Sequence, residues 1–361
     1  FTKYETYLSD RYIMNAPEQS PQQGINPRSG WIKHVIALIF GVVLLWLAFR
    51  GCNFAEIWNY AKSVNPIYLS LIFLSGIASH FLRAWRWIFL LKPLAPENKN
   101  PGLWNSFCSV VYGYAVNAVI PKGGEIVRMV SMSKMENLPW AGGLPTLLID
   151  RLLDVLCLAI MTGLTLTILP DSVKTAMPWI AQVGFPMLGG ALLALIFLPK
   201  LSPIMRWFIK LSFVQKFLPD SIKNKIGELM DQFEKGSSGI ANPVMYPIIT
   251  LQTVLMWALY WANFYLMVYG FDLQNKVKLV DTVIVFTIGS VSNFIPTPGS
   301  VGGFHVFVKE SLMLTSGVNP DQAMAFATVL HLMCYMVTTF IPAGICYLVN
   351  MLNSRKEGSA I

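Results

Sequence analysis

The sequence is poor in charged residues. Only 13% of its 361 residues are Asp, Glu, Lys or Arg, whereas 54% are hydrophobic. Soluble globular proteins carry about 25% charged residues, so this composition excludes an ordinary soluble enzyme and predicts an all-α polytopic membrane protein. The long apolar runs predict about six full spans, at 32–49, 67–81, 143–169, 178–198, 244–270 and 323–349.

Cysteine is also scarce, and its spacing carries no motif. The five cysteines show no CxxC pair, and four of them fall in apolar segments, so we expect neither a disulfide framework nor a metal site. The nucleotide-binding pattern Gly-Lys-Ser/Thr is missing, which excludes ATP as a direct driver, and we expect no cofactor. Residues 1–30 are polar and predict a flexible cytoplasmic arm without a cleavable signal peptide.

What the sequence does contain is a pair of similar Gly/Pro breaks. One lies at 117–125 and follows the apolar stretch 103–120, and the other lies at 293–303 and follows the apolar stretch 279–295. Paired breaks in corresponding positions of two halves are typical of transporters whose binding site lies near the bilayer midplane. The sequence therefore favours membrane transport.

Lysine and arginine placement favours re-entrant hairpins at both breaks. With the amino terminus inside, this topology puts most of the 27 positive residues on the cytoplasmic side, as the positive-inside rule requires. If the first break belonged to a full span instead, every later loop would change sides. The hairpin topology also accounts for the net charge of +8 without nucleic acid as a partner.

The same topology predicts an inverted repeat. Its halves, about 67–169 and 244–349, each contain a span, a hairpin and a second span, and the hairpins enter from opposite sides. Irregular backbone inside a membrane is tolerated only where protein or a wet cavity covers it, so the hairpins predict a shared central cavity. We further expect one transmembrane domain at 31–350, a cytoplasmic amphipathic loop at 199–243 and a cytoplasmic tail at 351–361.

Three charged residues within the predicted span 143–169 form a candidate site. Asp150 and Asp154 are one helical turn apart, and Arg151 stands three residues before Asp154. Buried charges cost several kcal/mol unless they meet a cavity or a partner. Two interpretations stay open, namely an internal ion pair that supports the first hairpin, and an arginine that meets a lipid phosphate.

The first break offers a second candidate. Glu125 and Arg128 follow it at the same spacing of three residues, and Lys122 lies within it. If a half-helix begins here, its free amides and Lys122 form an anion-binding end suited to a phosphate headgroup. The alternative is a capped interfacial helix whose charges stay in water.

Histidines and arginines elsewhere carry weaker signals. His80, Arg83 and Trp87 share a helical face near the cytoplasmic end of the second span, where they are either snorkelling and belt residues or a headgroup-selecting rim. His305 and His331 are either satisfied structural residues or a pair that lines the cavity and titrates if transport is coupled to protons.

Taken together, the motifs resemble the flippase-like membrane domain of the lysylphosphatidylglycerol synthases. The resemblance rests on the run Asn117–Arg128, the Asp150–Asp154 motif, the break Pro296–Gly303 and the approach to the last span, and covers roughly 31–350. It implies a domain that moves an aminoacylated phospholipid between leaflets after a separate synthase domain has made it. Many members carry an acid in place of His305 and an arginine in place of His331, which leaves the substrate and coupling ion open.

Our hypothesis is a lipid translocase of the cytoplasmic membrane with both termini cytoplasmic. We do not expect it to be an enzyme or to aminoacylate lipid, because the sequence contains no synthase domain. The expected partner is a phospholipid or a polyprenyl-phosphate-linked lipid, and a homodimer stays open. The alternatives are a membrane enzyme acting on lipid phosphates, with Asp150/Asp154 as metal ligands or the histidines as acid and base, and an accessory subunit of a lipid synthase. The predicted substrate-binding residues are Asn117, Lys122, Glu125, Arg128, Asp150, Arg151, Asp154, Asn293, Pro298, Gly299, His305 and His331.

Overall fold

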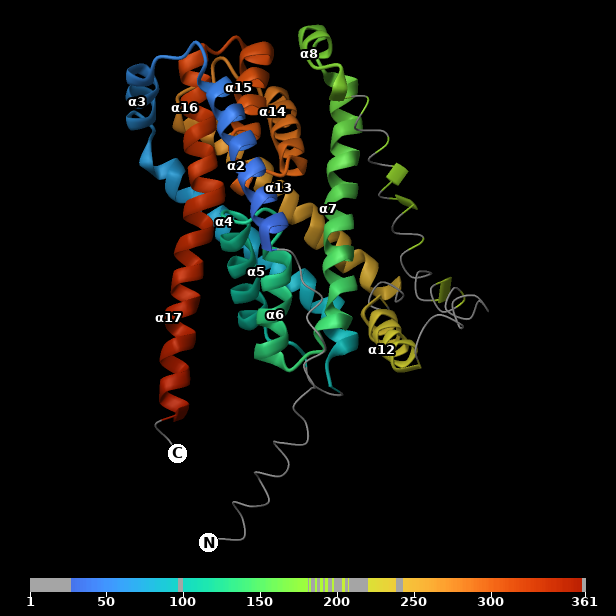
Figure 1. Ribbon diagram of the computed structural model, residues 1–361. Coiled ribbons are helices and arrows are strands. Elements are labelled where there is room, and N and C mark those ends of the chain that lie inside the picture. The colour runs from blue at the N-terminus through green and yellow to red at the C-terminus, as the bar shows by residue number, and fades with distance from the viewer. Residues whose placement is uncertain are drawn as a thin grey trace, which may run out of the picture.

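The structure is a computed structural model. It describes residues 27–96, 100–180, 220–237 and 243–358, together with isolated positions between 182 and 207. All regular structure in this part of the chain is helical (Figure 1). The prediction of an all-α membrane protein is confirmed. The predicted span 178–198 and most of the loop 199–243 lie outside the described residues.

Three helical stretches are long and apolar enough to cross a membrane, namely Pro66–Leu94, Tyr246–Gly270 and Pro320–Asn353. A fourth crossing is provided if the helix pair Val35–Phe49 and Phe54–Lys62, bent by 87°, counts as one span. Helix α7, Trp140–Ile168, has 29 residues and therefore a length of roughly 43 Å, but it carries the charged motif near its middle.

The first part of the chain forms α2 (Pro27–Phe49), α3 (Phe54–Lys62) and α4 (Pro66–Leu91). Helix α4 begins where the side chain of Asn65 accepts a hydrogen bond from the Ile67 amide. The helix continues ten residues beyond the predicted end at 81, because no breaker occurs until the 3₁₀ turn at Lys92–Leu94. Arg83 and Arg86, which the sequence predicts at the cytoplasmic membrane surface, therefore belong to α4. Their side chains are buried against neighbouring helices.

Both predicted breaks are real and both divide helical hairpins. The first hairpin consists of α5 (Leu103–Asn117) and α6 (Gly124–Glu136), with Lys122 in the left-handed region at φ 64° between them. The second consists of α14 (Leu279–Val291) and α15 (Gly303–Ser316), joined through the short turns Ser292–Phe294 and Pro298–Ser300. Gly299 and Gly302 in this break also have positive φ angles, which glycine adopts without strain.

The two halves pack in a reciprocal way. Helix α4 lies along α13 (Tyr246–Gly270), α7 of the first half packs on α14 of the second, and α17 (Thr338–Gly358) packs on α5 of the first. In Figure 1 the first hairpin occupies the lower half of the molecule and the second occupies the upper half. The hairpins therefore approach each other from opposite ends. The described residues also form α8 (Asp171–Ala176) and α12 (Asp220–Ser237), which packs on α7. Helix α16 (Pro320–His331) continues into α17 through a π-helical segment at Leu332–Val337.

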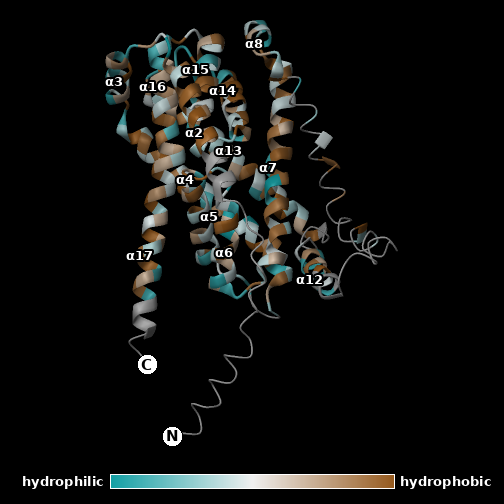
Figure 2. Ribbon diagram, viewed as in Figure 1, coloured by the Kyte–Doolittle hydropathy of each residue, from teal (hydrophilic) through white to brown (hydrophobic). Residues whose placement is uncertain are grey.

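Among the described residues, the two larger hydrophobic clusters lie one around each hairpin, and a third, smaller cluster joins α8 to α14. Phe286, Phe304 and Phe326 belong to the cluster of the second hairpin, whereas Trp87 and Met129 belong to that of the first. Many large apolar side chains of α2, α4, α13 and α17 are exposed instead. Figure 2 shows how much of these helices consists of hydrophobic residues. A membrane protein exposes such side chains to lipid.

Candidate functional site

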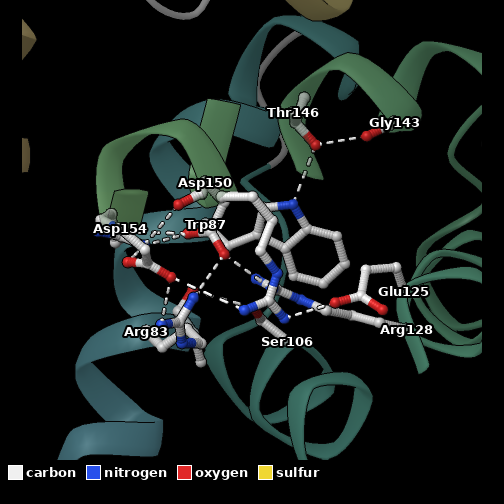
Figure 3. A network of polar contacts seen from close by, with 12 residues as sticks. Arg83, Trp87, Ser106, Glu125, Arg128, Gly143, Thr146, Asp150 and Asp154 are labelled. Atoms are coloured by element: carbon white, nitrogen blue, oxygen red, sulfur yellow. Dashed lines mark hydrogen bonds and ion pairs between the residues drawn. The ribbon is translucent and has the colours of Figure 1, made fainter. Parts of the chain in front are cut away.

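Side chains from four helices form a buried arginine–aspartate network beside the first hairpin (Figure 3). The carboxylate of Asp150 accepts hydrogen bonds from Arg83 Nη1 at 2.9 Å, from Arg128 Nη1 at 2.8 Å and from Arg86 Nη2 at 2.7 Å. Arg86 Nε adds a second bond to the same carboxylate at 3.0 Å, which makes this pair bidentate. Asp150 and Arg86 are completely inaccessible to solvent.

Asp154 extends the network by one turn of α7 and is more exposed than Asp150. It accepts from Arg83 Nη2 at 2.6 Å and from Arg86 Nη2 at 2.8 Å. Arg86 Nη1 also donates to the hydroxyl of Thr253 on α13. The network thus joins the consecutive helices α6 and α7 to α4 and α13, which lie before and after them in the sequence.

Arg151 belongs to the half-exposed edge of this network. Its main partner is Glu125 on α6 at 2.8 Å, whereas Asp154 lies 3.8 Å away. The expected pairs at a spacing of three residues are therefore not the main contacts. Glu125 pairs with Arg151, and Arg128 pairs with Asp150, because side chains of neighbouring helices reach these groups more directly.

Trp87 holds Arg128 in place. The guanidinium of Arg128 lies 4.0 Å from the centre of the Trp87 ring, a cation–π distance, and the indole N–H donates to Thr146 Oγ1 at 2.9 Å (Figure 3). Trp87 is therefore a supporting residue inside the first cluster, and Arg83 is a central member of the network. Both side chains are buried, so the interpretation of Arg83 and Trp87 as snorkelling and belt residues is wrong. The interpretation of Arg83 as part of a headgroup-selecting rim stays a prediction, since Arg83 lines the cavity described below.

The tips of the two hairpins touch. Lys122 Nζ lies 3.4 Å from the backbone oxygen of Asn293, to which it donates. Gly299 of the second tip lies close to the backbone of Ala118 in the first. A methyl group added to Gly299 would lie 3.5 Å from the Ala118 Cα atom. The two breaks, 171 residues apart along the chain for Lys122 and Asn293, therefore form one structural unit.

Local hydrogen bonds fix each tip. At the first, Asn117 Oδ1 accepts from the Gly124 amide at 2.8 Å, so the first free amide of α6 already has a partner. At the second, Asn293 Oδ1 accepts from the Tyr335 hydroxyl at 2.9 Å and from the Ser300 hydroxyl at 3.0 Å. Tyr335 lies in the π-helical segment between α16 and α17, a feature frequent at functional sites.

A cavity of about 580 Å³ lies between the two tips and the helices α4, α7, α13 and α17. Its wall combines charged groups near the first hairpin with aromatic and amide groups of α13 and the second hairpin. Seven of the predicted site residues line it: Asn117, Lys122, Glu125, Arg151, Asp154, Asn293 and Gly299. The other five, Arg128, Asp150, Pro298, His305 and His331, are not among the lining residues.

The two predicted histidines do meet, but behind the wall. Their ring centres are 4.7 Å apart, and both side chains are buried. His331 Nε2 lies 2.8 Å from the Gly299 carbonyl oxygen and must carry a proton to donate to it. The ring of His331 also stacks on Tyr335 at 4.7 Å. The pair therefore supports the second tip, as the structural interpretation expects, and the prediction that it lines the cavity is wrong.

Positive charge predominates around the cavity. Among the described residues the network contains Arg83, Arg86, Arg128 and Arg151 against three carboxylates, and Lys122 stands at the cavity wall beside it. Of these groups, Arg83, Arg151 and Lys122 line the cavity together with the carboxylates Glu125 and Asp154, so its wall carries an excess of positive charge. The site can neutralise an anion without losing any of its own ion pairs.

Sequence comparison agrees with this architecture. The profile of the lysylphosphatidylglycerol synthase transmembrane region matches residues 34–341. The chain belongs to this family. The match includes both hairpins, the arginine–aspartate network and the histidine pair of this lysylphosphatidylglycerol synthase transmembrane domain.

Two curated proteins are similar to the domain. Glycosyltransferase AglD of Haloferax volcanii is 22% identical over 357 residues, which cover 90% of this chain and 56% of that protein. The UPF0104 membrane protein MJ1595 of Methanocaldococcus jannaschii is 29% identical over 178 residues, 48% of each chain. The chain spans about half the length of the curated relatives it matches.

Proposed function

We propose that this domain is a lipid translocase. The headgroup of a phospholipid or a lipid-linked phosphate enters the cavity between the two hairpin tips, while the acyl or prenyl tails stay in the bilayer. The observation that carries the proposal is the contact of two broken hairpins at a cavity with excess positive charge. Transporters place their substrates at such discontinuous helices.

The polar wall of the cavity would replace the hydration that a headgroup loses when it crosses the bilayer without a protein. Moving a charged headgroup through hydrocarbon costs many kcal/mol because its hydration shell is lost. Arg151 and Lys122 lie at the half-exposed and exposed edges of the wall and would replace water around the phosphate. The buried core of the network, around Asp150, would hold both groups in position without contacting the lipid.

The reciprocal packing of the halves supports alternating access. Each hairpin packs against a long helix of the other half: α14 against α7, and α5 against α17. In this proposal the hairpins are re-entrant, the domain lies in the cytoplasmic membrane and both termini are cytoplasmic. A rocking of one half against the other would then open the cavity toward one leaflet at a time.

The alternative function is that of a lipid-modifying enzyme, and the relative AglD is named a glycosyltransferase. Metal-assisted chemistry at Asp150 and Asp154 is disfavoured by their contacts, because arginines already donate to both oxygens of each carboxylate. A mass spectrum of the lipids distinguishes the two functions. An enzyme changes covalent composition, whereas a translocase changes only sidedness.

The test is a leaflet-sidedness assay with the purified full chain in liposomes. Acyl-labelled fluorescent phospholipids and a membrane-impermeant quencher report how fast the protected inner-leaflet signal is lost. We expect acceleration by the wild-type protein and a loss of roughly tenfold in Arg151→Gln or Lys122→Gln, equivalent to one charge-assisted hydrogen bond.

Lys134→Gln is the matched control, because Lys134 is an exposed lysine in the last turn of α6 and does not line the cavity. It is expected to leave the rate unchanged. No acceleration by folded wild-type protein with any lipid would overturn the proposed function and favour the enzyme or an accessory subunit.

A further inference from the structure

Helix α3 lies across the end of α2. The two helices meet at 87°, and the rings of Phe49 and Phe54 stack at the bend with their centres 5.0 Å apart. Helix α3 also packs against α16, where the amide of Asn53 donates to Asp321 Oδ1 at 2.7 Å. Figure 1 shows α3 beside α16, at the end of the molecule that holds the second hairpin. An α2 that runs along the bilayer normal therefore places α3 close to the membrane plane.

Two sides of α3 suit the protein and water. Each residue of a helix is rotated by about 100° from the one before it. Ile57 is buried and Tyr60 is half-buried, so their side of the helix faces the rest of the molecule. Glu56 and Asn59 are exposed and share a second side. A carboxylate and an amide are the groups expected on a side that contacts water.

The third side of α3 is aromatic and basic. Phe54, Trp58 and Lys62 follow one another at a spacing of four residues, so they form one row along the helix. Phe54 and Trp58 are 67% and 61% exposed, so the described chain leaves this row largely uncovered. Glu56 is rotated by about 160° from Trp58, which places the acid away from the row.

The end of α2 has the same character as this row. Val42 and Trp46 are exposed one helical turn apart, and Trp46 is 62% exposed. The guanidinium carbon of Arg50, one turn further on, lies 5.9 Å from the centre of the Trp46 ring. On α3, Lys62 Nζ lies 4.9 Å from the centre of the Trp58 ring. Both helices therefore present an exposed tryptophan with a cation beside it.

This pattern fits the headgroup zone of a bilayer. Tryptophan is enriched there, and an amphipathic helix with aromatic and basic residues lies in the membrane plane. Positive groups near the surface attract anionic lipids. We infer that α3 and the end of α2 dock on the anionic headgroup layer of one leaflet. Trp46, Phe54 and Trp58 insert among the headgroups. Arg50 and Lys62 pair with the lipid phosphates.

The docking surface is separate from the cavity and does not depend on translocation. Trp46, Arg50, Trp58 and Lys62 are not among the residues that line the cavity. The backbone oxygen of Arg50 accepts a hydrogen bond from Lys309 of α15 at 3.4 Å. A lipid bound at this surface would lie outside the transport path and would be linked through α2 to the second hairpin.

The test measures which lipids surround Trp58. The full chain is reconstituted in bilayers of phosphatidylcholine and phosphatidylglycerol, with one of the two lipids brominated at a shallow acyl carbon, because bromine quenches tryptophan fluorescence at contact. The emission that is lost in Trp58→Phe belongs to Trp58. We expect its quenching to show a preference for phosphatidylglycerol of at least about threefold, since one basic residue near an anionic surface contributes about fivefold.

Charge variants isolate the basic groups of the surface. Lys62→Gln should lower the preference for phosphatidylglycerol about twofold or more, and Lys62→Gln combined with Arg50→Gln should abolish it. Lys276→Gln is the matched control, because Lys276 is an exposed lysine in the loop between α13 and α14. It should leave the preference unchanged. A preference that persists in the folded double variant would contradict the pairing with lipid phosphates.

Two further outcomes would overturn the inference. Equal quenching of Trp58 by the two brominated lipids would show that the surface does not favour anionic headgroups. No quenching by either lipid, in folded protein, would show that Trp58 contacts water or another protein chain, such as a second copy. Neither result bears on the proposed translocase, because the sidedness assay measures transport through the cavity.

Discussion

The two hairpins share a backbone plan but differ in chemistry. Both break at a Gly/Pro segment and both present their tip to the same cavity. The first is held by ions, since Glu125 and Arg128 of α6 pair with Arg151 and Asp150 of α7. The second is held by neutral contacts, chiefly His331 to the Gly299 carbonyl and Tyr335 to Asn293. The two halves therefore share the backbone arrangement of a broken hairpin, whereas the side-chain contacts that stabilise the hairpin differ between them.

The largest effect is expected at the ionic hairpin. Asp150→Asn removes the charge that balances three buried arginines, so the folded state should lose about 3–5 kcal/mol. Asp154→Asn should cost less, because its side chain is 14% exposed and lines the cavity. Thermal unfolding of the detergent-purified variants measures the difference. Equal losses at the two positions would mean that Asp150 is not the centre of the network.

A second comparison replaces one glycine in each hairpin. In Gly124→Ala the new methyl group would overlap the Gly113 carbonyl oxygen, and in Gly302→Ala it would lie 2.6 Å from the Gly41 oxygen at a φ of 85°. Both variants should lose about 2 kcal/mol or more, through overpacking and backbone strain.

Gly163→Ala in α7 is the control for these two variants, because a Cβ there meets nothing within 4 Å. It should be neutral or slightly stabilising. Unfolding midpoints of the three variants, measured side by side, test the expectation. A tolerated Gly302→Ala would show that the second hairpin does not rely on close contact with α2.

The smallest effect is expected at the neutral hairpin. His331→Phe keeps a ring that stacks on Tyr335 but leaves the Gly299 carbonyl without its donor, so the loss should be about 1–2 kcal/mol. His331→Gln retains an N–H donor and should recover part of it. A loss as large as that of Asp150→Asn would remove the distinction between ionic and neutral hairpins.

Much of the framework could be predicted from the sequence, because clusters of Gly and Pro favour turns over helix. Single prolines such as Pro145 and Pro342 do stand inside helices. The breaks at 117–125 and 293–303 indicated two hairpins, and Asn117, Lys122 and Asn293 indeed line one cavity. These inferences needed only local rules. The predicted span at 178–198 stays a prediction.

The arginines of α4 could not be placed by the same rules. The apolar run of α4 ends at its first arginine, so the sequence predicts that Arg83 and Arg86 lie at the membrane surface. Their burial depends on Asp150, whose carboxylate is 64 residues away from Arg86 in the sequence. The sequence did contain a signal for this contact. Arg83 and Arg86 share one face of a long helix, and Asp150 and Asp154 share one face of another, so the two faces carry opposite charges.

The histidine pair shows a different limit. The sequence suggested that His305 and His331 come together, and they do. Whether a pair lies in a cavity wall or behind it depends on neighbouring side chains. Here Phe304 and Tyr335 line the cavity and pack against the ring of His331.

Lys309 links the second hairpin to a helix outside the repeat. Its buried ammonium group donates to the backbone oxygens of Ala48 at 2.9 Å and Arg50 at 3.4 Å, at the carboxyl end of α2. One turn away from this bond, Gly302 lies against Gly41 and Leu44 of the same helix. Helix α2 is thus fastened to the hairpin at two points and acts as a splint along it. If the second hairpin moves, either α2 moves with it or the hydrogen bonds of Lys309 break. The position of α2 therefore reports the position of the hairpin.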